Sequence, residues 1–139
     1  MSVFVDANVL VAGALPSERA HAKAVRLLRE TETQGPFTTD HVLVEAWHVL
    51  RARKGFASAL RFWQSLAHTP LTIEAVSLPD LERARAIAEL WQDQEFDLVD
   101  CASFAVMERV GCARAASFDR DFAVYRFGPG RARAFEILG

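Results

Sequence analysis

Apolar residues recur along this chain with two alternating spacings. Short β-branched or alternating runs predict strands, and apolar residues three and four positions apart predict helices between them. The expected strands cover residues 3–5, 37–39, 71–76, 114–117 and 134–138. The expected helices cover residues 8–15, 17–33, 40–53, 56–67, 77–91 and 98–110. This alternation predicts an α/β fold with a mostly parallel sheet flanked by helices.

Small polar residues stand at the expected helix starts. The predicted N-caps are Ser17, Asp40, Ser77 and Asp97. Ser77 is followed three residues later by Asp80, which is the spacing of a capping box. Gly111 is expected to end the helix over 98–110. No repeat or linker interrupts the pattern, so we expect one domain spanning residues 1–139.

The composition is that of an ordinary globular chain. With 51% hydrophobic and 24% charged residues, it excludes disordered, collagen-like and coiled-coil classes. No apolar run approaches the ~20 residues that span a bilayer. Residues 1–6 carry no basic segment, so we expect no signal peptide and a cytoplasmic protein. Cys101 and Cys112 are expected to be reduced thiols in the core.

Charge is segregated along the chain, although the net charge is only −2. Residues 46–73 carry four basic residues and no acid, whereas residues 74–100 carry eight acids and two basic residues. This distribution predicts a basic strip beside an acidic pocket. Fourteen of the sixteen cations are arginines, which suit phosphate recognition, but genomic base composition explains the same bias equally well.

Four acidic residues stand in unusual surroundings. Asp6 and Asp119 follow apolar strands directly, and ligands of parallel sheets bind beyond the carboxyl ends of the strands. Glu45 lies in an apolar helix without a basic partner one turn away, and Asp100 lies in an apolar stretch next to a cap. Turn formation, a solvated helix face and the helix dipole are the structural alternatives. Brought together, the four would need a hard divalent cation such as Mg²⁺ or Mn²⁺.

These residues belong to four motifs: Val-Phe-Val-Asp-Ala-Asn-Val-Leu at 3–10, Val-Glu at 44–45, Asp-Leu-Val-Asp-Cys-Ala at 97–102 and Ser-Phe-Asp-Arg-Asp-Phe at 117–122. In this order the motifs resemble PIN-domain proteins, specifically the VapC-like ribonuclease toxins of prokaryotic toxin–antitoxin pairs. The resemblance covers nearly the whole chain. It implies a three-layer α/β/α domain with a parallel sheet of four or five strands.

The resemblance also implies roles for individual residues. The acidic quartet that binds Mg²⁺ or Mn²⁺ corresponds to Asp6, Glu45, Asp100 and Asp119. Asn8 and Ser117 correspond to supporting hydrogen-bonding residues, and Asp121 is an additional acid ranked below Asp119. The implied partners are an RNA substrate, a VapB-like antitoxin whose tail covers the site, and a second copy in a homodimer.

The implied activity is metal-dependent endoribonuclease cleavage. A water activated at the metal attacks the phosphodiester, so no 2′-hydroxyl is needed and the product carries a 5′-phosphate. The candidates for contacts with the RNA backbone are Arg51, Arg53, Lys54 and Arg120.

Three other functions remain as alternatives. A haloacid-dehalogenase-like phosphatase would need a second Asp where this chain has Asn8. His41, Glu45 and His48 share a helix face and resemble half of a di-iron site, which would also need a second Glu-x-x-His and further Glu residues from facing helices. A catalytically silent PIN-fold module binding RNA or protein is the third.

The three tryptophans lie at helical spacing among apolar neighbours. We expect Trp47, Trp63 and Trp91 to belong to the core or to a dimer interface rather than to stack on bases.

Overall fold

The computed structural model describes all residues from 1 to 139. The strands are β1 (Val3–Val5), β2 (Pro36–Thr39), β3 (Thr72–Glu74), β4 (Arg114–Ala116), β5 (Arg126–Phe127), β6 (Arg133–Ala134) and β7 (Glu136–Leu138). The α-helices are α1 (Ala7–Ala14), α2 (His21–Thr31), α3 (Asp40–Lys54), α4 (Phe56–Ser65), α5 (Leu78–Leu90), α6 (Leu98–Val110) and α7 (Asp121–Val124). Short 3₁₀ turns cover Leu66–His68, Gln92–Gln94 and Pro129–Arg131.

Five strands form one parallel sheet in the order β3-β2-β1-β4-β7. The first strand lies at the centre, where Phe4 pairs with Phe37 of β2 on one side and with Ala115 of β4 on the other. Because all five strands run in the same direction, their carboxyl ends meet at one edge of the sheet. This confirms the predicted α/β class and the five-stranded parallel sheet.

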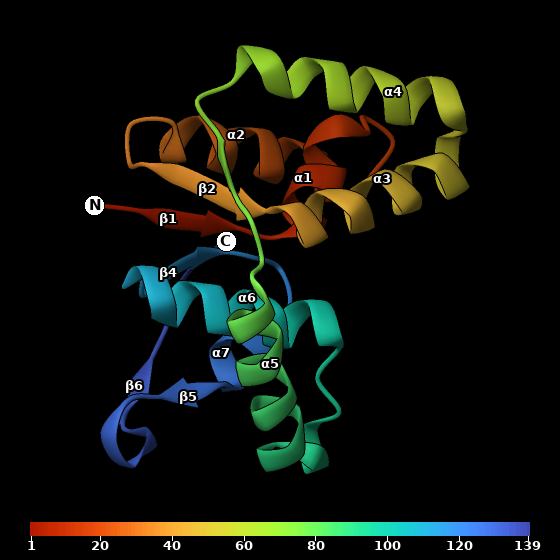
Figure 1. Ribbon diagram of the computed structural model, residues 1–139. Coiled ribbons are helices and arrows are strands. Elements are labelled where there is room, and N and C mark those ends of the chain that lie inside the picture. Colours follow the sequence, from red (N-terminus) through yellow and green to blue (C-terminus); the bar gives the residue numbers. More distant parts are fainter.

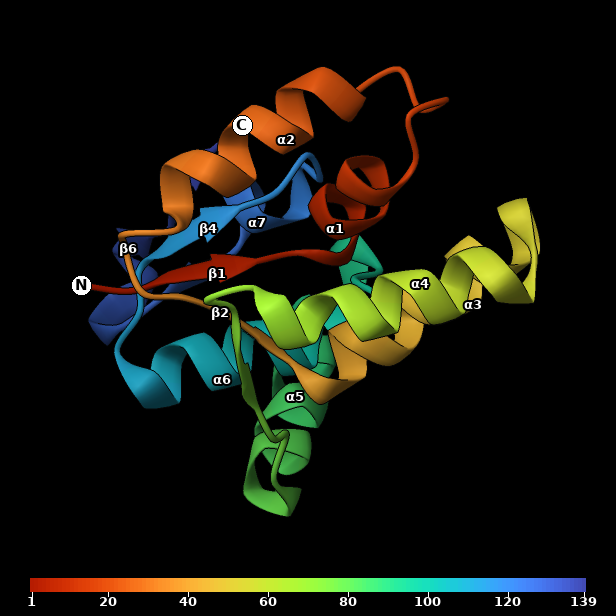
Figure 2. The same ribbon diagram turned by 90° about the horizontal axis from the view of Figure 1, so that it is seen from above.

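The helices form layers on both sides of the sheet (Figure 1). Helices α1, α2 and α4 lie on one face, and α5, α6 and α7 lie on the other. Helix α3 continues from β2 beyond the edge of the sheet, and the view from above shows α4 running alongside it (Figure 2). The arrangement is the three-layer α/β/α sandwich that the resemblance implied.

The central strand is fully buried because it is covered on both faces. Val3, Phe4 and Val5 have no exposed surface, as expected for an apolar run in a parallel sheet. On one side Phe4 stacks on Phe122 of α7, with ring centroids 5.6 Å apart. Residues 96–135 add an aromatic cluster centred on Tyr125, whose ring stacks on Phe104 at 4.4 Å. The rigid centre fixes the strand ends from which the candidate site is built.

Several predicted helix ends are confirmed. Ser77 and Asp80 form the reciprocal hydrogen bonds of a capping box at the start of α5, and Asp97 caps α6. Gly111 ends α6 in the left-handed conformation, with a φ of 74°.

Two predicted caps are wrong. Helix α2 begins at His21 rather than after Ser17, because residues 16–20 form turns in which Glu18 and His21 N–H groups bond to carbonyls three residues earlier. Thr39 caps α3 in place of Asp40, because its hydroxyl oxygen accepts the Val42 N–H. The Asp40 carboxylate instead accepts the Val76 N–H, a long-range contact that the local pattern does not reveal.

The last predicted strand, 134–138, is divided in two. Strand β6 pairs antiparallel with β5, whereas β7 pairs parallel with β4. The division falls at Phe135, which is buried and stacks on Phe127 at 4.7 Å. Burial of this ring in the aromatic cluster separates the two pairings.

The tryptophans do not share one environment. Trp47 and Trp91 are half-buried against the core, whereas Trp63 is 51% exposed and lies outside it. A core position for Trp63 was therefore wrong, and its place in a dimer interface stays a prediction. Cys101 and Cys112 are buried free cysteines, as expected. None of the helices combines the length and apolar character needed to cross a membrane.

Candidate active site

The candidate site lies at the carboxyl edge of the sheet, where the central strands end. Asp6 directly follows β1, and its N–H donates to the Ala116 carbonyl at the end of β4. Its side chain caps α1 by accepting the Ala7 N–H at 2.8 Å. The strand end and the helix start together hold the carboxylate in one orientation, and only 4% of the residue is exposed.

Ser117 connects Asp6 to Asp119, the first and last of the four predicted acids. Its hydroxyl donates to Asp6 Oδ2 at 2.8 Å and accepts the Asp119 N–H at 3.0 Å. Asn8 supports the same loop, because its Oδ1 accepts the Phe118 N–H at 3.1 Å. The two residues expected to support the site therefore both hydrogen-bond within it.

Two further carboxylates, from Asp100 and Asp121, lie close to Asp119. Asp100, on the first turn of α6, has a carboxylate oxygen within 4.8 Å of oxygens from Asp119 and Asp121. The Asp121 N–H also donates to Asp119 Oδ1 at 2.9 Å. Asp121, which sequence reasoning ranked below Asp119, is thus a full member of the cluster.

Burial and mutual repulsion disfavour the ionised state of these acids. Burial is the main cause that raises the pKa of Asp6 to about 6, against hydrogen bonds from Ser117 and Ala7 that lower it. For Asp100, burial followed by repulsion from Asp6 and Asp119 raises the pKa to about 8. Without a cation, Asp100 therefore retains its proton at neutral pH.

Glu45 completes the set from the side of α3. Burial is the main cause that raises its pKa, followed by repulsion from Asp6, Asp97 and Asp119. Burial and the neighbouring Asp119 raise the pKa of Asp121 in the same way. The fold therefore places Asp100, Asp119 and Asp121 within 4.8 Å of one another. Asp6 and Glu45 lie outside this group but near enough for repulsion between them and Asp100 to raise its pKa, although positions 6 and 119 are 113 residues apart.

The donor set of this cluster suits a hard divalent cation. Every candidate ligand is a carboxylate oxygen, the type that Mg²⁺ and Mn²⁺ prefer. No basic side chain forms an ion pair with Asp6, Asp100 or Asp119, so the negative charge is uncompensated within the chain. The residues present fit such an ion.

His41 and His48, the histidines of the di-iron alternative, line a surface hollow next to Glu45. Its volume is about 440 Å³, and its lining includes Glu45, His41, His48 and Val99. His41 Nδ1 lies 2.9 Å from Asp40 Oδ1 rather than facing the other ring. The group of acids within 4.8 Å of one another contains neither histidine, nor Glu45 or Asp6, so His41, Glu45 and His48 do not form the ligand set of a di-iron site.

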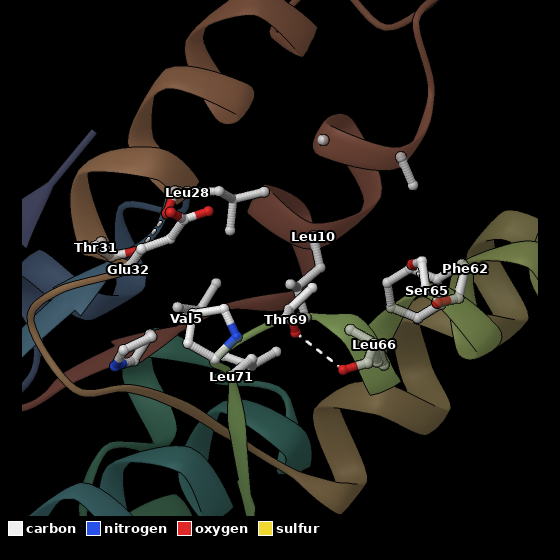
Figure 3. A pocket seen from close by; sticks show the side chains of 14 residues that line it. Val5, Leu10, Leu28, Thr31, Glu32, Phe62, Ser65, Leu66, Thr69 and Leu71 are labelled. Carbon is white, nitrogen blue, oxygen red and sulfur yellow. Dashed lines mark hydrogen bonds between the residues drawn. The ribbon is translucent and has the colours of Figure 1, made fainter.

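A separate apolar cavity lies in the layer of α1, α2 and α4 (Figure 3). Its volume is about 170 Å³, and Val5, Leu10, Leu28 and Leu71 point toward one another across it. Glu32 is the only acid in its lining, and none of the clustered carboxylates reaches it. Despite being the better enclosed of the two, this cavity lacks groups for phosphodiester chemistry.

The four predicted RNA-backbone residues are unequally available. Arg53 forms an ion pair with Glu18, and Arg51 lies over the Phe56 ring at 5.8 Å. Lys54 is exposed at the end of α3, and Arg120 is exposed on the loop between two acids of the cluster. Arg120 is thus the only one of the four that is adjacent in sequence to the carboxylates.

Comparison with known proteins gives consistent results. A family described as "PIN domain" matches residues 3–128. The 23S rRNA-specific endonuclease VapC20 of Mycobacterium tuberculosis is 30% identical over 125 residues, which cover 90% of this chain and 95% of that protein.

Solved structures agree with the sequence match. The crystal structure of M. tuberculosis VapC20, described as a sarcin–ricin loop cleaving toxin, has a TM-score of 0.81 and 30% identity, covering 88% of this chain and 93% of that one. VapBC2 from Rickettsia felis, bound to promoter DNA, has a TM-score of 0.65 at 10% identity, covering 86% and 89%. The latter likeness concerns the fold alone.

Proposed function

Because this chain belongs to the PIN-domain family, we propose that it is a metal-dependent endoribonuclease, the VapC-like toxin of a toxin–antitoxin pair. The observation that carries the proposal is the group formed by Asp100, Asp119 and Asp121 at one edge of the sheet, with Asp6 and Glu45 near enough to repel these acids. Similarity to an RNA endonuclease over nine-tenths of the chain supports it.

The clustered acids would hold Mg²⁺ or Mn²⁺. When bound, the ion supplies Lewis-acid polarisation of the phosphodiester and makes water a better nucleophile at neutral pH. The protein's contribution is orientation: Asp6 is held by two hydrogen bonds, and Ser117 links it to the loop that carries Asp119. Asn8 fixes that loop from the other side by accepting the Phe118 N–H.

The raised pKa values support a role for this cluster in cation binding. An ion offsets the burial and the repulsion that raise the pKa of Asp100 and of Asp6, so ion binding and proton release are coupled. Glu45 would contact the ion or orient water from the side of the hollow. A binding module without catalysis would gain nothing from so costly an arrangement of buried acids.

We propose ribosomal RNA as the substrate class, and the sarcin–ricin loop as the first sequence to test. The support is the printed specificity of VapC20 together with 30% identity over 90% of this chain.

A VapB-like antitoxin is the proposed protein partner. The support is that toxin–antitoxin complexes occur among proteins with the same fold. An arginine from that partner, inserted among uncompensated carboxylates, would replace the cation electrostatically. A homodimer is also proposed, with the exposed apolar residues Val44, Phe56 and Trp63 as candidates for its interface.

The function is tested by cleavage of a synthetic sarcin–ricin hairpin and of an unrelated RNA hairpin. We expect cleavage with Mg²⁺ or Mn²⁺, loss of cleavage in EDTA, and products with a 5′-phosphate. Asp6→Asn should lower the rate by orders of magnitude, while Asp93→Asn, an exposed acid elsewhere, should not. Full activity in EDTA or a cyclic-phosphate product would contradict the proposed chemistry, and an inactive wild-type protein would favour the silent module.

A further inference from the structure

Helix α2 carries a row of basic side chains on its outer surface. The residues are Arg19, in the turn before the helix, and Lys23, Arg26 and Arg29 within it. All four are exposed, and the spacing of three to four positions places them along one side of the helix. We call these four residues the α2 basic row. Near its far end, Arg26 and Arg29 border a surface hollow of about 470 Å³.

The charge of the α2 basic row is not compensated within the protein. None of its members takes part in an ion pair or a side-chain hydrogen bond to an acid. Elsewhere, by contrast, five arginines are paired with carboxylates: Arg53, Arg83, Arg85, Arg109 and Arg114. Glu30 is the one acid that shares the rim of the hollow. The row therefore presents a net positive surface.

One member of the α2 basic row, Lys23, contacts the loop that carries Asp119. The Lys23 ammonium lies over the Phe118 ring, with Nζ 5.5 Å from the ring centroid. Phe118 immediately precedes Asp119, and its N–H donates to the Asn8 side chain in the first turn of α1. The view from above shows α2 extending across the same side of the fold as the loop after β4 (Figure 2), and the Lys23–Phe118 contact joins the two. The row thus leads away from the carboxylates along α2.

We infer that the α2 basic row binds the phosphate backbone of the RNA strand next to the scissile bond. This inference rests on the proposed function. A polyanion that approaches the three clustered carboxylates and their acidic neighbours is repelled unless cations lie along its path. Unpaired arginines and a lysine at the edge of the cluster supply that attraction, and they contact phosphates without reading bases. Arg120, on the same loop as Phe118, extends the row toward the acids.

The test is a charge-matched pair of triple variants. In the first, Lys23, Arg26 and Arg29 are each changed to Gln, which removes three charges from α2. The matched control removes three exposed arginine charges from other surfaces through Arg61→Gln, Arg85→Gln and Arg131→Gln. Both proteins have the same net charge, so a difference between them reports position. Thermal unfolding verifies that both remain folded.

Binding is measured in an Asp6→Asn background, which prevents cleavage, on the sarcin–ricin hairpin and the unrelated hairpin at several salt concentrations. Each phosphate contact contributes roughly 0.7 to 0.9 to the slope of log affinity against log salt. For the α2 triple variant we expect the slope to fall by about two and the affinity at moderate salt to fall about 10- to 100-fold, equally for both RNAs. The control triple variant should match the parent protein. With Asp6 restored, the α2 triple variant should show a raised KM and an unchanged kcat.

The outcomes separate the inference from the function on which it rests. If the wild-type protein cleaves RNA and the α2 triple variant keeps the parental slope, the inference is wrong and the function stands. If RNA binding is unchanged but binding of the co-encoded antitoxin is lost, the row serves an acidic protein segment and the inference is also wrong. If the wild-type protein neither binds nor cleaves either RNA, the proposed function fails and the inference fails with it.

Discussion

Replacing Asp100 with Asn should stabilise the metal-free protein, and the gain should grow with pH. The Asp100 carboxyl ionises near 3.8 in an unfolded chain, whereas in the folded protein its pKa is about 8. Between these values the folded protein keeps a proton that the unfolded chain has lost. Stability from this group is therefore complete below about pH 4 and is lost as the pH rises through 8.

The size of the effect follows from the shift. One pKa unit corresponds to about 1.4 kcal/mol, so a shift of roughly four units sets an upper limit of about 5 kcal/mol above pH 8. Asp100 is only 8% exposed, so solvent screening reduces this limit little. Asn has nearly the same shape but no charge, so Asp100→Asn should remove most of the cost while leaving the packing of α6 intact.

The assay is urea unfolding in EDTA at pH 4.5, 7 and 8.5. At pH 4.5 the variant and the wild type should differ by less than about 1 kcal/mol, and at pH 8.5 the variant should be more stable by about 2 to 5 kcal/mol. Saturating Mg²⁺ should then reverse the order, because only the wild type retains the full donor set. Asp93→Asn serves as the control on an exposed acid. A difference that stays constant with pH, or a less stable variant at pH 8.5, would refute the reasoning.

Three further changes test other parts of the structure. Ser117→Ala removes the hydrogen bond to Asp6 Oδ2 and the one from the Asp119 N–H. In steady-state kinetics kcat should fall about 10- to 100-fold, with little change in melting temperature. An unchanged kcat would show that the hydroxyl is not needed. Arg109→Ala leaves the buried Asp80 carboxylate without its bidentate partner. The free energy of unfolding in urea should therefore fall by about 1 to 3 kcal/mol. An unchanged free energy would mean that the capping box with Ser77 is enough to hold Asp80. Cys101 is fully buried, and burial, followed by repulsion from the neighbouring Asp100, raises its pKa to about 11. Iodoacetamide at pH 8 should therefore modify this thiol only after the protein unfolds, as followed by mass spectrometry. Rapid modification of the folded protein would contradict this prediction.

Much of the sheet and the acidic cluster could be predicted because each depends on local pattern. The buried run at 3–5 identified the central strand, and Asp6 at its end marked the edge where ligands bind. Glu45 stood out because its helical neighbours are apolar and no basic residue lies one turn away. Such signals need no knowledge of distant contacts.

The errors occurred where distant residues decide the local structure. Asp40 has the chemistry of a cap, yet its carboxylate binds the Val76 N–H, 36 positions away, and leaves capping to Thr39. Phe135 divides a strand because its ring enters an aromatic cluster assembled from four segments. The α2 basic row escaped notice because residues 1–45 have a net charge of −2, which conceals four cations collected on one side of a helix.

The hydrogen bond between Ser117 and Asp6 joins residues 111 positions apart, across the pairing of β4 with β1. A nascent chain that ends before β4 holds Asp6, Glu45 and Asp100 but has neither this bond nor Asp119. The carboxylate group is therefore complete only after the segment from β4 onward has left the exit tunnel and paired with the first strand. For an enzyme proposed to attack ribosomal RNA, this order of assembly delays damage to the particle that synthesises it.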